Sequence, residues 1–155
     1  FAMNYDAGNL STYLYKELGG KLQLAVWDFN NGFDNYQWFR TETDALYTVE
    51  NSWFERLWQD KTFRKCVCER YRQLRKTTLS DEYIYDKIAS YQEELGDAVD
   101  RNFKVWGYSF DETLLAGTTK EGTSRDIGSY EEAVKQLTDT IRERLAYLDK
   151  ELGGN

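Results

Sequence analysis

The apolar side chains of residues 51–106 and 129–152 recur every three or four positions, and this period constrains the fold more than any other feature of the chain. Residues at that spacing lie on one face of an α-helix, where they can pack together. The pattern predicts about four helices. The third is expected to be long, because one apolar stripe keeps the spacing from Ile84 to Trp106.

Short polar side chains stand where the helices should begin. Such side chains accept hydrogen bonds from the first backbone N–H groups of a helix. Ser129 is followed three residues later by Glu132, which is the sequence pattern of a capping box. The other candidate caps are Asn51 or Ser52, Asp60 and Ser80, and Gly153-Gly154 should end the last helix.

Before residue 50 the pattern is that of strands. Residues 12–15 and 21–27 are rich in aromatic and aliphatic side chains, and Gly19-Gly20 suits a turn, so a β-hairpin is predicted. Its second strand is apolar enough to be covered on both faces. Because an isolated hairpin is marginally stable, it should pack on the helices. The predicted fold is α+β, mostly α, with a β-hairpin packed on about four helices. Residues 107–128, rich in Gly, Ser and Thr, are expected to form a loop or lid.

Composition excludes several classes of function. The chain has no histidine, which removes His-based acid/base catalysis and most zinc sites. Its formal net charge of −7 offers no basic footprint for nucleic acid. No apolar run reaches the roughly 20 residues that a membrane span requires.

Tryptophans and basic residues allow more than one interpretation. Trp53, Trp58 and Trp106 fall at helical spacing and are expected in the core, whereas Trp38 is a candidate for a substrate or partner rim. The basic residues within 64–76 form either a solvated helix face or a docking surface for an acidic partner or phosphate.

Two aspartates flank the hairpin and are candidates for chemistry. Asp6 precedes the first strand and Asp28 ends the second, and an intervening hairpin can return the chain to the same edge. Converging carboxylates repel each other unless a cation or proton lies between them, and Mg²⁺ with phosphate oxygens would satisfy both. In a second arrangement, used by protein kinases, Asp28 binds the metal and Asp6 orients a hydroxyl nucleophile. An acid at a strand end is also often an ordinary cap.

The segment NYDAGNLSTYLYKELGGKLQLAVWDFNNGFDNY, residues 4–36, resembles the C-terminal active-site segment of the CotH kinase family, atypical kinases similar to spore coat protein H. The resemblance continues through RYRQLRKTTLS, DRNFKVWG and the closing LTDTIRERLAYLDKEL, and so spans nearly the whole chain. The matching features of the first segment are Asn4-Tyr5-Asp6, the strand 11–16, Gly19-Gly20-Lys21 and Trp27-Asp28-Phe29.

This resemblance implies a reduced protein-kinase-like fold that transfers phosphate from ATP, with Mg²⁺, to serine of coat or surface proteins. Asp6 would be the catalytic-loop acid and Asp28 the metal-binding acid, with Asn9 or Asn30 as a further ligand. Asn9, Ser11 and Asn30 would be the cofactor-binding residues, although Ser11 stands where the family usually has Asn and Asn30 where many members have Asp. Both differences are expected to weaken the binding of the metal ion. Asn9 is the candidate substitute for the missing Asn.

The resemblance further implies that residues 1–155 form the C-terminal lobe of such a kinase, located at the spore coat or cell surface. No glycine-rich phosphate loop and no strand with an ATP-binding Lys precede Asp6. We therefore expect little phosphate transfer by this chain alone. Two alternatives stay open: a non-catalytic module for coat or surface assembly, and a carbohydrate-binding module that uses exposed tryptophans. Arg101 would buttress the active-site loop or form a surface ion pair.

Overall fold

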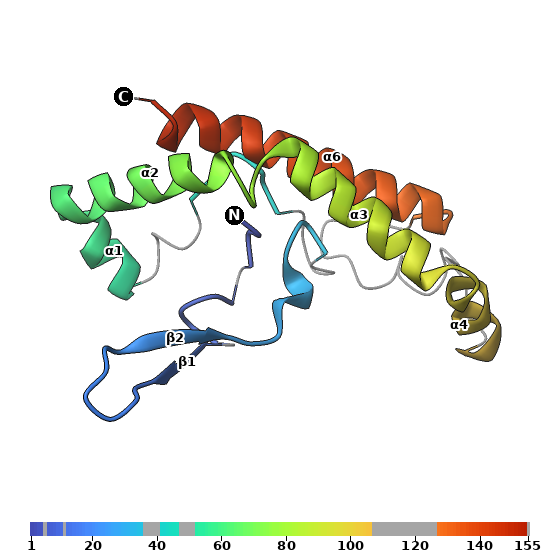
Figure 1. The fold of residues 1–155 in the computed structure, drawn as a ribbon, viewed down its shortest axis with the longest axis horizontal. Helices are drawn as coiled ribbons and strands as arrows, with labels where there is room; N and C mark the ends of the chain where they lie inside the picture. The colour runs from blue at the N-terminus through green and yellow to red at the C-terminus, as the bar shows by residue number, and fades with distance from the viewer. Residues whose placement is uncertain (5, 11, 36–40, 47–51, 107–126, 155) are drawn as a thin grey trace.

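The computed structural model describes residues 1–4, 6–10, 12–35, 41–46, 52–106 and 127–154, and it has the expected mostly helical α+β class (Figure 1). Two antiparallel strands come first and five α-helices follow within these residues. The elements are β1 (Thr12–Tyr15), β2 (Gln23–Val26), the 3₁₀ helix η1 (Phe29–Asn31), α1 (Ser52–Trp58), α2 (Lys61–Arg75), α3 (Asp81–Leu95), α4 (Ala98–Trp106) and α6 (Tyr130–Leu152).

The predicted caps of α2, α3 and α6 are confirmed. The side chains of Asp60, Ser80 and Ser129 each accept a hydrogen bond from the backbone nitrogen three residues later. Glu132 completes the cap of α6 one residue earlier than in a standard capping box, because it accepts from the nitrogen of Gly128 at 2.7 Å. Asn51 lies outside the described residues.

The expectation of one long third helix is wrong. The apolar stripe continues from α3 into α4, but the chain breaks between them at Gly96, whose φ is +42°. Only glycine adopts such a conformation at low cost, so it ends α3 at Leu95 and lets α4 leave in another direction (Figure 1).

The core lies where α6 packs along both α2 and α3, which follow one another beside it (Figure 1). One cluster joins Tyr71 of α2 to Leu148 and Leu152 of α6. A second joins Ile84 of α3 to two further residues of the α6 stripe, Ile141 and Leu145. The predicted apolar stripe of the last helix is therefore the side that holds the helices together.

A polar network closes the corner between α2, α3 and α6. The guanidinium of Arg75 donates to both carboxylate oxygens of Asp149, at 2.9 and 3.0 Å, and to Asp81 at 2.9 Å. The Tyr71 hydroxyl donates to Asp149 at 2.7 Å. Burial alone would raise the pKa of Asp149, but the hydrogen bonds from Arg75 and Tyr71 outweigh it and lower that pKa.

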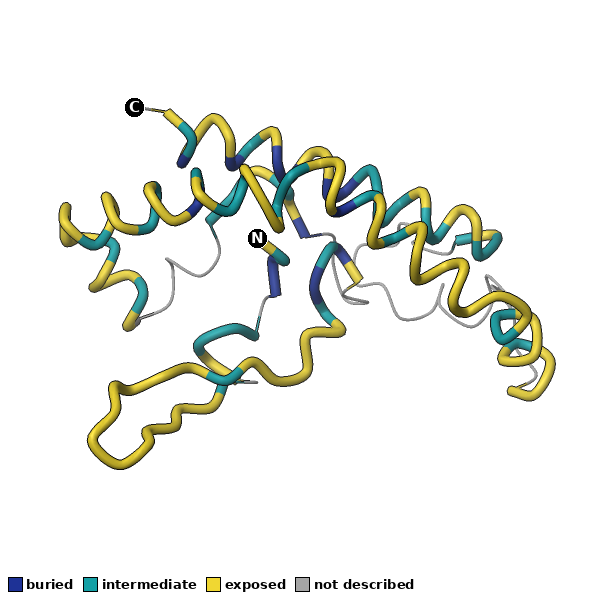
Figure 2. The backbone as a smooth tube through the Cα atoms, viewed as in Figure 1, coloured by how far each residue is buried: buried dark blue, intermediate teal, exposed yellow. Residues whose placement is uncertain are grey.

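The hairpin forms as predicted, but it does not pack on the helices. Thr12 pairs with Val26 and Tyr15 with Gln23, so the strands are in antiparallel register. Both strands are mostly exposed and extend away from the helices (Figure 2). Val26 keeps 74% of its surface, so the prediction that the second strand is covered on both faces is wrong. An apolar run indicates a tendency to be buried but does not specify which surface will cover it.

The expectation for the tryptophans is correct only in part. Trp58 packs against the cluster of Tyr71, whereas Trp53 and Trp106 are exposed. The proposed rim at Trp38 and most of the predicted loop 107–128 lie outside the described residues.

Candidate active site

Asp6 lies in a tight turn that leads into β1. Its backbone carbonyl accepts hydrogen bonds from the nitrogens of Asn9 and Leu10, at 3.0 and 2.9 Å, so the chain reverses directly after it. Gly8, with φ of +90°, provides the conformation that this reversal requires. The Asp6 side chain is half-buried.

A residue beyond the hairpin contacts Asp6. The side-chain nitrogen of Asn31, in η1, donates to a carboxylate oxygen of Asp6 at 3.1 Å. Twenty-five positions separate the two residues, and the hairpin closes that distance because Thr12 pairs with Val26. Asn31 was not among the predicted site residues. The signal available in the sequence was that Asn31 closely follows Trp27-Asp28-Phe29, but its neighbour Asn30 does so as well.

Asp28 stands at the same end of the hairpin, immediately before η1. It is exposed and has left-handed backbone angles, φ 53° and ψ 55°, and its side chain makes no capping hydrogen bond to η1. A non-glycine residue in this conformation costs about 1 kcal/mol or more. The Asp28 carboxylate therefore does not serve as the cap that an acid at a strand end often is.

The other predicted site residues are placed differently. Asn9 and Asn30 are exposed, and Asn30 contributes its backbone carbonyl, which accepts from the side chain of Asn35 at 2.8 Å. Ser11 lies outside the described residues.

A buried amide adjoins the Asp6 turn. The side-chain oxygen of Asn4 accepts from the backbone nitrogen of Asp6 at 3.2 Å. Its amide nitrogen is buried and has no hydrogen-bond partner in the described part of the chain. A buried donor without a partner costs about 1–3 kcal/mol, so a bound acceptor group would be favourable there.

Both arms of the hairpin are tied to the helices. The nitrogen of Phe33 donates to the carbonyl of Ala2 at 2.6 Å, and the Phe33 ring packs on the cluster of Ile84 and against Phe1. Arg144 of α6 is buried and donates to the carbonyls of Phe1, Thr43 and Ala45. Arg101, the residue predicted as a candidate for such a role, is exposed on α4.

The family model described as CotH kinase protein matches residues 1–148 of the 155. The chain belongs to the CotH kinase family. The resemblance found in the sequence is thus confirmed, and membership suggests a kinase-related function that uses ATP and a protein substrate. No curated protein and no solved structure gives a significant match, so the likeness to a kinase lobe has no support from structural neighbours.

Two features bear on how a CotH kinase chain could bind Mg²⁺. Within the described residues, no three His, Cys, Asp or Glu side chains are close enough to share a metal ion. Mg²⁺ usually takes one or two carboxylates and completes its shell with phosphate and water. The oxygen donors of Asp6 and Asp28 fit that chemistry, provided that a nucleotide supplies the remaining ligands.

In the part that the structure describes, no helix has the length and apolar character needed to cross a bilayer.

Proposed function

We propose that this chain is the C-terminal catalytic portion of an atypical Ser/Thr protein kinase that transfers phosphate from ATP to coat or surface proteins. The observation that supports it best is the hydrogen bond from Asn31 to Asp6. It joins the turn before β1 to the segment that follows Asp28, as a catalytic acid and a metal-binding acid at one nucleotide site require.

In this proposal Asp6 orients the hydroxyl of the acceptor serine or threonine and accepts its proton. The hydroxyl oxygen forms a bond to the γ-phosphorus, the bond to the oxygen of the β-phosphate breaks, and ADP leaves. Asp28, with Asn9 or Asn30, would hold Mg²⁺, which would supply positive charge to offset that of the phosphate oxygens. Asn31 keeps the Asp6 carboxylate in place, and Asn4 offers its buried amide to an acceptor group.

Substitution of Asp28 tests the proposal in the full-length protein. Asn is well tolerated in the left-handed conformation of Asp28, so Asp28→Asn removes the charge with little backbone cost. We expect radiolabel transfer from ATP to a serine-containing peptide to fall at least 100-fold, while the urea unfolding midpoint is unchanged. Asp44→Asn, an exposed acid outside the hairpin, is the matched control and should retain full transfer.

Calorimetry with Mg·ATP separates the proposal from the non-catalytic alternatives. A kinase should release heat on binding Mg·ATP, and Asp28→Asn should abolish that heat. An assembly module would give none. A carbohydrate-binding module would instead be retained on immobilised glycan. Unchanged radiolabel transfer by the Asp28→Asn protein would reject the assignment of Asp28.

A further inference from the structure

The charge of this acidic chain is unevenly distributed. Residues 52–76, which comprise α1, α2 and the turns that follow them, contain eight basic and three acidic residues, a net charge of +5. The rest of the chain contains twelve basic and twenty-four acidic residues, a net charge of −12. A segment of opposite sign to the rest of the molecule indicates a surface that attracts anionic partners.

Some of these basic side chains serve the fold. Arg75 binds Asp149 and Asp81, Arg72 donates to the carbonyls of Leu152 and Gly154, and Lys65 lies 3.8 Å from Glu69. Within the described residues, no carboxylate lies within ion-pair distance of the others, namely Arg56, Lys61, Arg64, Arg70 and Lys76. In the described part of the chain, no carboxylate therefore neutralises their charge.

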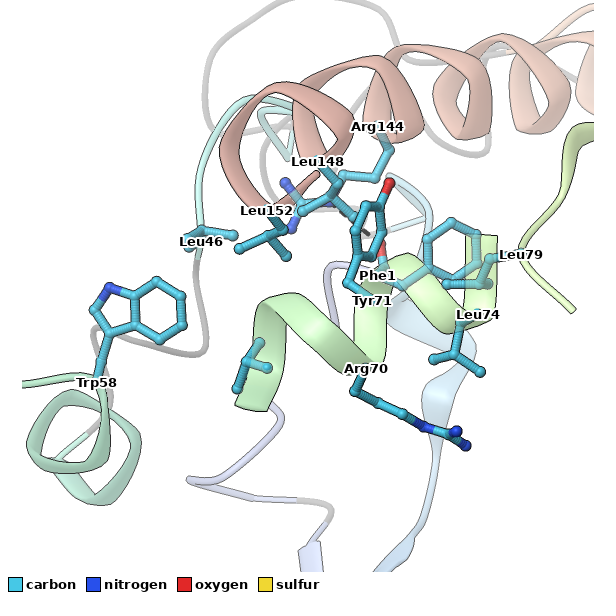
Figure 3. A pocket seen from close by; sticks show the side chains of 11 residues that line it. Phe1, Leu46, Trp58, Arg70, Tyr71, Leu74, Leu79, Arg144, Leu148 and Leu152 are labelled. Atoms are coloured by element: carbon cyan, nitrogen blue, oxygen red, sulfur yellow. Dashed lines mark hydrogen bonds between the residues drawn. The ribbon is translucent and has the colours of Figure 1, made fainter. Parts of the chain in front are cut away.

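An apolar pocket of about 330 Å³ opens beside this basic helix. Figure 3 shows Trp58 of α1 at one side, Leu148 and Leu152 of α6 opposite α2, and Arg70 extending from α2 away from the apolar side chains. Val67 and Leu74 of α2 complete the apolar wall. Arg64 and Arg70 stand three positions before and after Val67, so they lie on the adjacent turns of the helix surface.

We propose that this pocket and the basic face of α1 and α2 together dock a short acidic peptide segment that carries one aromatic or aliphatic anchor. The anchor fills the pocket, and flanking Asp or Glu side chains pair with Arg64 and Arg70. A short segment suits the site better than a nucleic acid, because an extended polyanion would meet the −12 charge of the remaining chain. The inference does not depend on phosphotransfer, since none of these residues forms a hydrogen bond with Asp6 or Asp28 in the described part of the chain.

Fluorescence anisotropy of the 155-residue chain tests this docking surface. The probe is a labelled peptide, Glu-Asp-Glu-Phe-Leu-Glu-Asp-Glu, and the comparison peptides replace the acids by Lys or Phe-Leu by Gly-Ser. We expect binding by the first peptide alone, weakened at least tenfold between 50 and 300 mM salt, as for exposed charges. Binding of the Gly-Ser peptide with equal affinity would remove the pocket from the proposal.

Charge reversal locates the site. Arg64→Glu with Arg70→Glu should weaken binding at least tenfold, whereas Lys16→Glu with Lys104→Glu, the same charge change on the hairpin and α4, should alter it less than twofold. If the reversed pair unfolds, Arg64→Gln with Arg70→Gln should still weaken binding. An equal loss in both reversed pairs would overturn the proposal. The proposal would also be overturned if the chain bound a single-stranded RNA oligonucleotide more tightly than the acidic peptide. Self-association of the chain that the Arg substitutions abolish would overturn it as well.

Discussion

At the scale of single residues, burial changes the acidity of the α-amino group that Phe1 carries in the isolated 155-residue chain. The Phe1 ring is partly exposed, but its amino group is surrounded by protein, and burial together with the charge of Arg144 lowers its pKa from 8.0 to about 6. In the unfolded chain the amine returns to its ordinary pKa. Between pH 6 and 8 the unfolded state therefore binds more protons than the folded state, and stability must rise with pH.

We predict that the free energy of unfolding of the 155-residue chain increases by at most about 2 kcal/mol between pH 6 and 8, because part of the effect of a two-unit shift falls outside this range. Urea unfolding across this range measures it. The absence of histidine removes the usual competing titration. Acetylation of Phe1 removes the titrating amine, so the free energy of unfolding should then no longer rise between pH 6 and 8. If it still rose in the acetylated chain, another group would be responsible.

The side chain of Arg75, in α2, joins three helices. It contacts Asp149 of α6 and Asp81 at the start of α3, and about a fifth of its side chain is exposed. We predict that Arg75→Ala lowers the free energy of unfolding by about 1–2 kcal/mol. The expected loss is modest because Asp149 and Asp81 are partly exposed and water screens their charges. Arg142→Ala, which removes an exposed pair with Asp139, should barely move the urea midpoint. Equal midpoints for the two variants would contradict the role of Arg75.

At the scale of elements, the hairpin is the part of the structure with the least cover. Its strands are held by their own hydrogen bonds and by an edge contact between the rings of Tyr13 and Trp27, whose centroids are 5.9 Å apart. An element with few buried contacts opens locally at low cost. The hairpin end that carries Asp28 should therefore be more mobile than the helices.

We predict that the amides of Leu14 and Leu24, which face each other across the hairpin, exchange with solvent at least 100-fold faster than those of Leu145 and Leu148 in α6. Hydrogen exchange followed by NMR measures both sets in one experiment. Mg·ATP added to the full-length protein should slow exchange in the hairpin alone. Equal protection of hairpin and helix would show that another surface covers the strands.

At the scale of the whole molecule, Arg144 connects the candidate site to the helical core. Its guanidinium donates to carbonyls of the segment before the hairpin and of the segment after it, while its position on α6 lies between Ile141 and Leu145. One side chain thus fixes where both arms of the hairpin lie relative to the helices.

We predict that Arg144→Met lowers the free energy of unfolding by about 3 kcal/mol or more, because it leaves several carbonyls without a donor. Urea unfolding measures this loss. Limited proteolysis should also cut residues 41–46 earlier in the variant than in the unchanged chain. Arg101→Met, on an exposed face of α4, is the matched control. The same stability in both variants would show that Arg144 does not anchor the site.

Local chemistry allowed the sequence alone to determine the strands, the hairpin turn, the start of α2, α3 and α6, and the apolar face of α6. Helix caps and apolar stripes involve residues three or four positions apart, so they can be recognised in a single sequence. The break at Gly96 was equally local, but the continuous apolar stripe concealed it.

Contacts between distant segments were decided only by the tertiary structure. The Asn31–Asp6 hydrogen bond spans 25 positions, and the bond from Arg144 to Phe1 spans 143. Nothing in the spacing of these residues distinguishes Asn31 from Asn30, or Arg144 from Arg101, because each pair has the same chemistry. The difference arises when folding places one member against a specific acceptor and leaves the other in water. For the same reason, the apolar sequence of β2 predicted that it pairs with β1, but it did not predict that both faces of the hairpin stay exposed.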